Sequence, residues 1–211
     1  MKTEDLIALL TDDTRPGRAV FPEVLFATLG PILVTGSVFL MVLGIRPDLT
    51  SAVTSPMAVW KWMLPGLLVV AGIALALALS RPESRPRKTW WVPLLTTAIG
   101  AALFASRAVI LPPTDWMAAI RGQTLLVCLA SISTIGLTGL VGGLAILRRG
   151  ATTRPGLSGL ALGLGSGGAA ALLYALHCNE DDPMFFVTWY GSAILAVGLI
   201  GAISGQRLLK M

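Results

Sequence analysis

The sequence predicts an all-α integral membrane protein, a bundle of six transmembrane helices, on three observations. Hydrophobic residues make up 55% of the 211-residue chain and charged residues 13%, whereas a soluble domain carries about a quarter charged residues. The mean hydropathy is +0.78. Apolar runs of about 20 residues, the length that a bilayer-spanning helix needs, recur along the chain.

The six apolar runs and the short segments between them fill the chain beyond its first residues. We therefore expect an N-terminal segment, residues 1–23, followed by one membrane domain, residues 24–211. The N-terminal segment is polar and acidic, and the first apolar run is too long for the core of a cleavable signal peptide, so we expect that run to be retained. The predicted spans are residues 24–45, 62–79, 91–110, 124–147, 157–176 and 185–205.

The basic residues are distributed unevenly between the two sides of such a bundle. Twelve of the sixteen lysines and arginines lie in the N-terminal segment, in the segments after the second and fourth runs, and in the C-terminal tail. The other side carries Arg46, Lys61, Arg107 and Arg121. The positive-inside rule then predicts that both termini are cytoplasmic and that the segment after the fifth run faces outward.

Small and hydroxyl-bearing residues mark the surfaces along which the spans pack. Gly159, Gly163 and Gly167 recur at spacings of four, which lets helix backbones approach closely in lipid. We expect these contacts within one chain rather than between two. The fourth run carries a stripe that we expect to face the bundle interior. Its members are Thr124, Cys128, Ser131, Thr134 and Thr138.

Charged side chains are almost absent from the predicted spans. Transport proteins usually place ionisable groups near the middle of the membrane, and we find none there. Arg107 is the nearest, but it lies close enough to the outer end of its run for its side chain to extend to the surface. This pattern disfavours a transport function.

The stretch "YALHCNEDDP", residues 174–183, holds the one histidine of the chain, His177, beside Cys178 and three acids. Asn179 and Pro183 predict a turn, and an acidic run of this kind is usually a solvated loop. The second cysteine, Cys128, lies roughly 7 Å along its helix from the same outer end, by the helical rise. We therefore expect both sulfur atoms near the outer end of one helix pair.

Three interpretations of the cysteine pair stay open on these grounds. Cys128 and Cys178 are small apolar core residues, or form a structural disulfide if their Cα atoms lie within about 4.4–6.8 Å, or form a sensing pair. Such a pair would react with oxidants or bind a soft metal ion, with His177 and Glu180 as further ligands. The chain has no C-x-x-C motif, so a permanent zinc site and catalytic thiol exchange are both weakly supported.

Residues 1–13, "MKTEDLIALLTDD", have the pattern of a short amphipathic helix. Its apolar side consists of Leu6, Ile7, Leu9 and Leu10. It could lie on the membrane, pack on the bundle or dock into a partner. Its acidic residues would be repelled by anionic lipid, so the groove of a partner protein is the preferred interpretation.

Several segments together resemble a family of bacterial membrane proteins, the negative regulators of sigma F, which are anti-sigma factors. They are "MKTEDLIALLTDD", the residues around Cys128 after "RGQ", the loop "RRGATTRPGLSG" and "YALHCNEDDPMFFVTWY". The resemblance covers essentially the whole chain. Its most specific part is the last segment, where the matching residues are His177, Cys178, Glu180, Pro183, Trp189 and Tyr190.

This resemblance implies a regulator of the bacterial inner membrane that is not an enzyme and needs no cofactor. Such proteins hold an extracytoplasmic-function sigma factor at the cytoplasmic face and release it under thiol-reactive heavy-metal or oxidative stress, without binding nucleic acid directly. It further implies that Cys128 and Cys178 are the sensors. The N-terminal segment and the inner loops would then bind the sigma factor.

Two functions of other classes compete with this one. A small transport subunit would need ionisable groups within the spans, and a membrane thiol oxidoreductase would favour a C-x-x-C motif. The sequence supplies neither.

Overall fold

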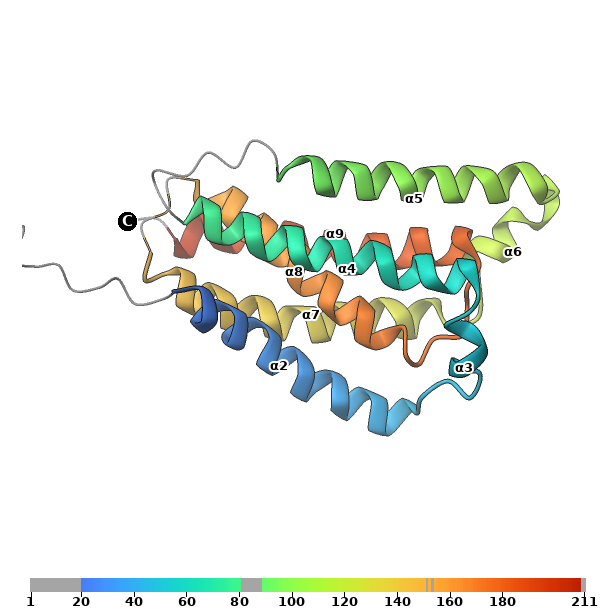
Figure 1. Cartoon of the computed structure of the whole chain (residues 1–211), viewed down its shortest axis with the longest axis horizontal. Helices are drawn as coiled ribbons and strands as arrows, with labels where there is room; N and C mark the ends of the chain where they lie inside the picture. The colour runs from blue at the N-terminus through green and yellow to red at the C-terminus, as the bar shows by residue number, and fades with distance from the viewer. Residues whose placement is uncertain (1–19, 81–88, 151, 153, 210–211) are drawn as a thin grey trace, which may run out of the picture.

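Six long helices form the bundle in the computed structural model, which describes residues 20–80, 89–150, 152 and 154–209 (Figure 1). All six are long and apolar enough to cross a membrane, which confirms the predicted number of spans and the all-α class. The long helices are α2 (Val20–Leu43), α4 (Pro56–Leu79), α5 (Trp91–Ile110), α7 (Leu125–Leu147), α8 (Pro155–Tyr174) and α9 (Pro183–Leu208). The short ones are α3 (Leu49–Ala52), η1 (Pro113–Asp115) and α6 (Trp116–Arg121).

Prolines begin three of the long helices earlier than the apolar runs predict. Pro56, Pro155 and Pro183 occupy the first position of α4, α8 and α9. Proline is tolerated there because its missing N–H group would have no partner within the helix. For α4 the earlier start is important, because it brings Lys61 inside a helix that was predicted to begin at residue 62.

Helix α8 is the central element, and it packs chiefly against α9 and α4 (Figure 1). Its glycines make that packing possible. A Cβ atom on Gly163 would lie 2.6 Å from the carbonyl oxygen of Val197, and one on Gly167 would lie 3.0 Å from Cα of Ile194. On the other side, a Cβ atom on Gly72 of α4 would lie 2.5 Å from the carbonyl oxygen of Ala161. The close approach predicted from the glycine spacing is confirmed.

The stripe along α7 turns inward only in part. Cys128 and Ser131 are buried, and Thr124 and Thr138 are partly buried, but Thr134 is exposed. The expectation was wrong at Thr134 because the inner face of the helix continues through Ile135 instead. A helix turns by about 100° per residue, so the two successive spacings of three from Cys128 to Thr134 displace the stripe by about 120° and carry Thr134 off the buried face.

The start of α2 and the end of α9 lie at the same end of the bundle (Figure 1). The segments that join α2 to α4, α5 to α7 and α8 to α9 lie at the opposite end, where the short helices are found. We call this opposite end the outer end. It contains both cysteines, because Cys128 is near the start of α7 and Cys178 follows α8.

Candidate functional site

The segment between α8 and α9, residues 176–182, makes hydrogen bonds with several other parts of the chain, and we call it the outer segment. Its first residues pair with the segment that follows α2. The backbone N–H of Arg46 donates to the carbonyl oxygen of Leu176 at 2.9 Å, and Nδ1 of His177 lies 2.9 Å from the carbonyl oxygen of Gly44. The connection after α2 therefore supports the start of the outer segment.

The first acid of the outer segment, Glu180, holds the beginning of α7. Its Oε1 atom accepts hydrogen bonds from the backbone N–H groups of Gln123 and Thr124, at 2.9 and 2.8 Å, and from the Thr124 hydroxyl at 2.7 Å. Gly122 makes this approach possible, because a Cβ atom there would collide with the Glu180 carboxylate. Glu180 thus connects the segment that carries one cysteine to the helix that carries the other.

The last acid, Asp182, has two partners on different helices. Its Oδ1 atom accepts from the backbone N–H of Met184 at 2.9 Å and caps α9. Its Oδ2 atom lies 2.8 Å from Nε of Arg107 on α5, whose side chain is 36% exposed. The side chain of Arg107 therefore ends in an ion pair, where the sequence predicted only an extension towards the surface.

The middle acid, Asp181, lies in a cluster of four charges. Arg46 donates to both Asp181 oxygens, at 3.0 and 2.7 Å, and to both Asp48 oxygens at 2.8 Å. Lys61 donates to Asp181 at 3.1 Å. We call Arg46, Asp48, Lys61 and Asp181 the ion cluster. The interpretation of the acidic run as a solvated loop is wrong, because each of its carboxylates accepts hydrogen bonds from other parts of the chain.

Lys61 is the residue that sequence reasoning missed. It is 1% exposed, and its ammonium group donates to the carbonyl oxygens of Cys178 and Glu180, at 2.7 and 3.0 Å, as well as to Asp181. An ammonium group has three N–H donors, so all three are used. Lys61 precedes the apolar run predicted to begin at residue 62, so the sequence placed it in a connection rather than inside a helix.

The charges of the cluster stabilise one another. Hydrogen bonding to Asp48 and then to Asp181 raises the pKa of Arg46 above its ordinary value. The hydrogen bond from Arg46 lowers the pKa of Asp48 from 3.8 to about 2. Burial acts to raise the pKa of Asp181, but the bonds from Arg46 and Lys61 outweigh it and the pKa lies below its ordinary value. Arg46, Asp48 and Asp181 are therefore charged near neutral pH.

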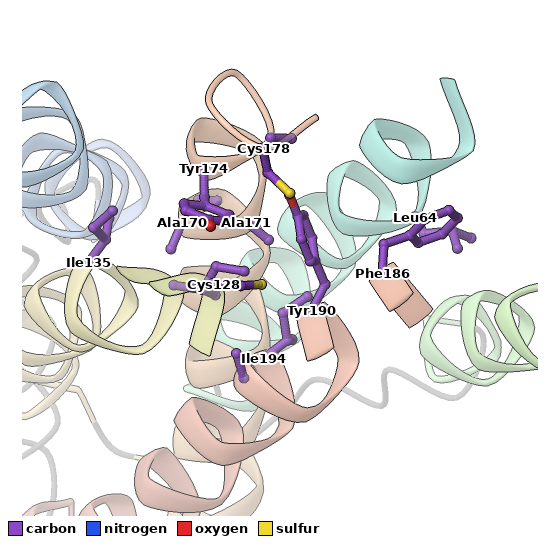
Figure 2. Close-up of a cluster of buried hydrophobic side chains, with 14 of the residues drawn as sticks. Leu64, Cys128, Ile135, Ala170, Ala171, Tyr174, Cys178, Phe186, Tyr190 and Ile194 are labelled. Atoms are coloured by element: carbon purple, nitrogen blue, oxygen red, sulfur yellow. The ribbon is translucent and has the colours of Figure 1, made fainter. Parts of the chain in front are cut away.

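Both cysteines, Cys178 within the outer segment and Cys128 on α7, are free and buried. Cys128 is 0% and Cys178 1% exposed, and they belong to one cluster of buried side chains. Figure 2 shows the Cys178 sulfur pointing toward the hydroxyl end of Tyr190, while the Cys128 sulfur enters the cluster from α7. The two thiols therefore share one enclosed environment, without a disulfide between them.

Two phenol groups border the thiols. The hydroxyls of Tyr174 and Tyr190 are buried, and that of Tyr190 faces the Cys178 sulfur. Their rings lie 5.9 Å apart between centroids, and Nζ of Lys61 lies 5.5 Å from the centre of the Tyr190 ring. The His177 ring lies 5.7 Å from that of Tyr174.

The remaining predicted site residues are placed as follows. His177 and Glu180 lie near the cysteines in sequence, but their ring nitrogen and carboxylate contact Gly44 and Thr124. Among the described residues no group of three or more His, Cys, Asp and Glu side chains is arranged to hold a metal ion. A metal site with these ligands stays a prediction. Leu6, Ile7, Leu9 and Leu10, predicted to bind the partner, lie outside the described residues.

An outer cleft of about 820 Å³ borders the same segment. It is lined by α6, by the turn that precedes α7 and by residues 179–182. Trp189 of α9 fixes α6, because its Nε1 donates to the carbonyl oxygen of Ile120 at 2.6 Å. The sequence predicted no helix in this region.

Six apolar helices with polar connections at both ends define a polytopic helical membrane protein. Within that class, the family described as negative regulator of sigma F matches residues 10–211, and the chain belongs to this family. It is 39% identical over 224 aligned residues to "Anti-sigma-F factor NrsF" of Caulobacter vibrioides (strain NA1000 / CB15N), with the whole of both chains covered. It is 30% identical over 215 residues, again across both whole chains, to "Probable anti-sigma-F factor NrsF" of Azospira oryzae. No solved structure matches the chain.

Proposed function

We propose that this protein is an anti-sigma factor of the bacterial inner membrane. It retains an extracytoplasmic-function sigma factor at the cytoplasmic face, and it releases that factor when a thiol-reactive metal or an oxidant reaches Cys128 and Cys178. The observation that carries the proposal is the pair of free thiols in one buried cluster at the outer end. Membership of the family supports the regulatory part.

The chemistry of the pair suits a thiophilic ion. A thiol loses its proton when it binds such an ion, and two thiolates in one pocket can share it. The buried hydroxyl of Tyr190, which faces the Cys178 sulfur, is a weak oxygen donor beside the pair. His177 and Glu180 would join only after leaving their present contacts with Gly44 and Thr124. A change of ligands at these two residues would therefore loosen the outer segment.

The signal reaches the opposite end through α8. Cys178 follows this helix, whose glycines rest on the backbones of α9 and α4. A contact between backbones has no flexible side chains to absorb a displacement, so a shift at the outer end moves the helix against its neighbours. Two packings of α7 and α8, one of which the sigma factor prefers, are enough to couple the two ends.

The orientation is part of the proposal. The basic residues favour cytoplasmic termini, so residues 1–13, with Leu6, Ile7, Leu9 and Leu10, would meet the sigma factor. A single cysteine placed at exposed Asp115 in a Cys128→Ser, Cys178→Ser background tests it. A membrane-impermeant maleimide added to intact spheroplasts should label that cysteine. Labelling only after lysis would reverse the orientation.

The central experiment is a pull-down of the cognate sigma factor with the full chain from solubilised membranes, with and without cadmium. The wild type should hold the sigma factor and shed it with cadmium, whereas the Cys128→Ser, Cys178→Ser variant should retain it in both conditions. Deletion of residues 2–13 should abolish binding without affecting membrane insertion. Cadmium release that is unchanged in the double variant would exclude the thiol sensor, and absence of sigma factor from every lane would exclude the anti-sigma role.

A further inference from the structure

We propose that Arg46 and Lys61 are positioning residues that hold the outer segment closed over the thiols, so that they control how readily a reagent reaches Cys178. The proposal rests on the proposed function of the cysteine pair as a sensor. It adds the part of the protein that sets the sensitivity of that sensor.

The first support is the backbone of Cys178 itself. Its carbonyl oxygen accepts from Nζ of Lys61 at 2.7 Å and from Nη1 of Arg46 at 3.1 Å. Two buried cations on different segments therefore bind the same peptide group. The side chain of Cys178 can become accessible only if that peptide moves, because it is 1% exposed in the present arrangement.

The second support is the number of donors engaged. A guanidinium group has five N–H donors, and Arg46 makes five hydrogen bonds, to Asp48, Asp181 and the Cys178 carbonyl. The three donors of Lys61 are also used. Arg46 is 4% exposed, and the cluster contains two cations and two carboxylates, so it is neutral as a whole. Opening the outer segment would separate the buried cations from their partners, and the cost of that separation opposes local opening of the segment.

The third support is the link to the other cysteine. Glu180 lies between the two peptide groups that the cations hold, and its carboxylate binds the backbone of Thr124 at the start of α7. Lys61 also holds the backbone of Glu180, because its Nζ donates to the Glu180 carbonyl oxygen at 3.0 Å. Release of the cations would therefore loosen the outer segment on the sides of both α8 and α7. A reagent would then gain access to Cys128 after Cys178.

The test measures thiol access separately from sigma release. The full chain in native membranes is treated with N-ethylmaleimide, and the labelling of each cysteine is followed over time by peptide mass spectrometry. Lys61→Met removes one cation, and Lys61→Arg keeps a cation at that position. Arg46→Lys keeps the charge but removes the guanidinium group that binds Asp48 and Asp181 together. The matched control is Arg121→Gln, which removes a positive charge from an exposed position at the same end.

We expect Cys178 to be labelled about tenfold faster in Lys61→Met and a few-fold faster in Arg46→Lys. Arg121→Gln should match the wild type, and Lys61→Arg should recover most of the protection. The cadmium concentration for half-release of the sigma factor should fall about tenfold in Lys61→Met, while retention without cadmium is preserved. A merely destabilised fold would instead label both cysteines together and lose retention without metal.

Wild-type labelling rates in folded Lys61→Met and Arg46→Lys would overturn the proposal. If Lys61→Met does not accumulate in the membrane, Arg46→Lys decides alone, because it keeps the charge balance of the cluster. Normal cadmium release with unchanged labelling would reject the positioning role and leave the sensor intact. Faster labelling in a protein whose sigma factor is never released would support the positioning role and reject the sensor.

Discussion

The outer end of the bundle and the middle of α8 are held together by opposite means. At the outer end, hydrogen bonds and ion pairs join charged side chains of α4, α5 and the connecting segments. In the middle, α8 meets α9 and α4 through glycines that bring backbone against backbone, without charge. The hydrogen bonds and ion pairs of the outer end are directional and join specific partners, whereas the packing of α8 depends on the complementary shapes of the helices.

The difference separates a region that depends on specific charged partners from a region that depends on close backbone packing. At the outer end two buried cations, Arg46 and Lys61, depend on carboxylates that are themselves partly exposed, so opening the outer segment would remove specific partners from buried charges. Along α8 a shift of the helix would change only the fit between backbones.

The largest expected effect comes from breaking the outer end. Asp181→Asn leaves Lys61 and Arg46 buried with one carboxylate between them, so we expect a loss of about 3–5 kcal/mol in the free energy of unfolding. Thermal unfolding of the protein in mild detergent measures it. Asp115→Asn, at an exposed position of the same end, is the control and should change the stability by less than about 0.5 kcal/mol. Equal stability of the two variants would mean that the cluster does not hold the outer end.

A smaller effect is expected in the middle of the bundle. Gly163→Ala places a methyl group 2.6 Å from the carbonyl oxygen of Val197, so overpacking should cost about 1–3 kcal/mol. Gly191→Ala on α9 is the matched control, because nothing lies within 4 Å of its Cβ position. Alanine is the better helix former, so the control should be neutral or slightly stabilised. The same thermal measurement separates the two, and a neutral Gly163→Ala would refute the close packing of α8.

The smallest effect concerns pH. The pKa of Asp48 is lowered to about 2 and that of Asp181 is also lowered, so both are charged in the folded state at a pH where unfolded carboxylates begin to bind protons. Their contribution to stability is complete above pH 4 and is lost as the pH falls toward 2. The unfolding temperature should therefore be constant from pH 7 to pH 5 and fall below pH 4. A fall already between pH 7 and pH 5 would contradict the ion cluster.

The fold could be predicted from the sequence far better than the site. The six apolar runs predict the bundle and the glycines spaced by four predict its central packing. An apolar segment in lipid must satisfy its backbone hydrogen bonds internally, and a helix does so. The ion cluster could not be predicted, because its partners Arg46 and Asp181 are 135 residues apart and pair only through the topology. Lys61 was assigned to the outer side because it precedes the apolar run predicted to begin at residue 62. The sequence alone does not show that its side chain turns into the bundle.

The separation between Arg46, Lys61 and Asp181 also has a consequence for the synthesis of the protein. A ribosome makes the two cations more than a hundred residues before their shared carboxylate, and α4 enters the membrane while Lys61 still lacks it. In that interval the lysine side chain must reach toward water at the end of its helix. The cluster can form only after the connection between α8 and α9, which carries Asp181, has been made. A product truncated before residue 181 would keep the Arg46–Asp48 pair but would leave Lys61 without its carboxylate partner.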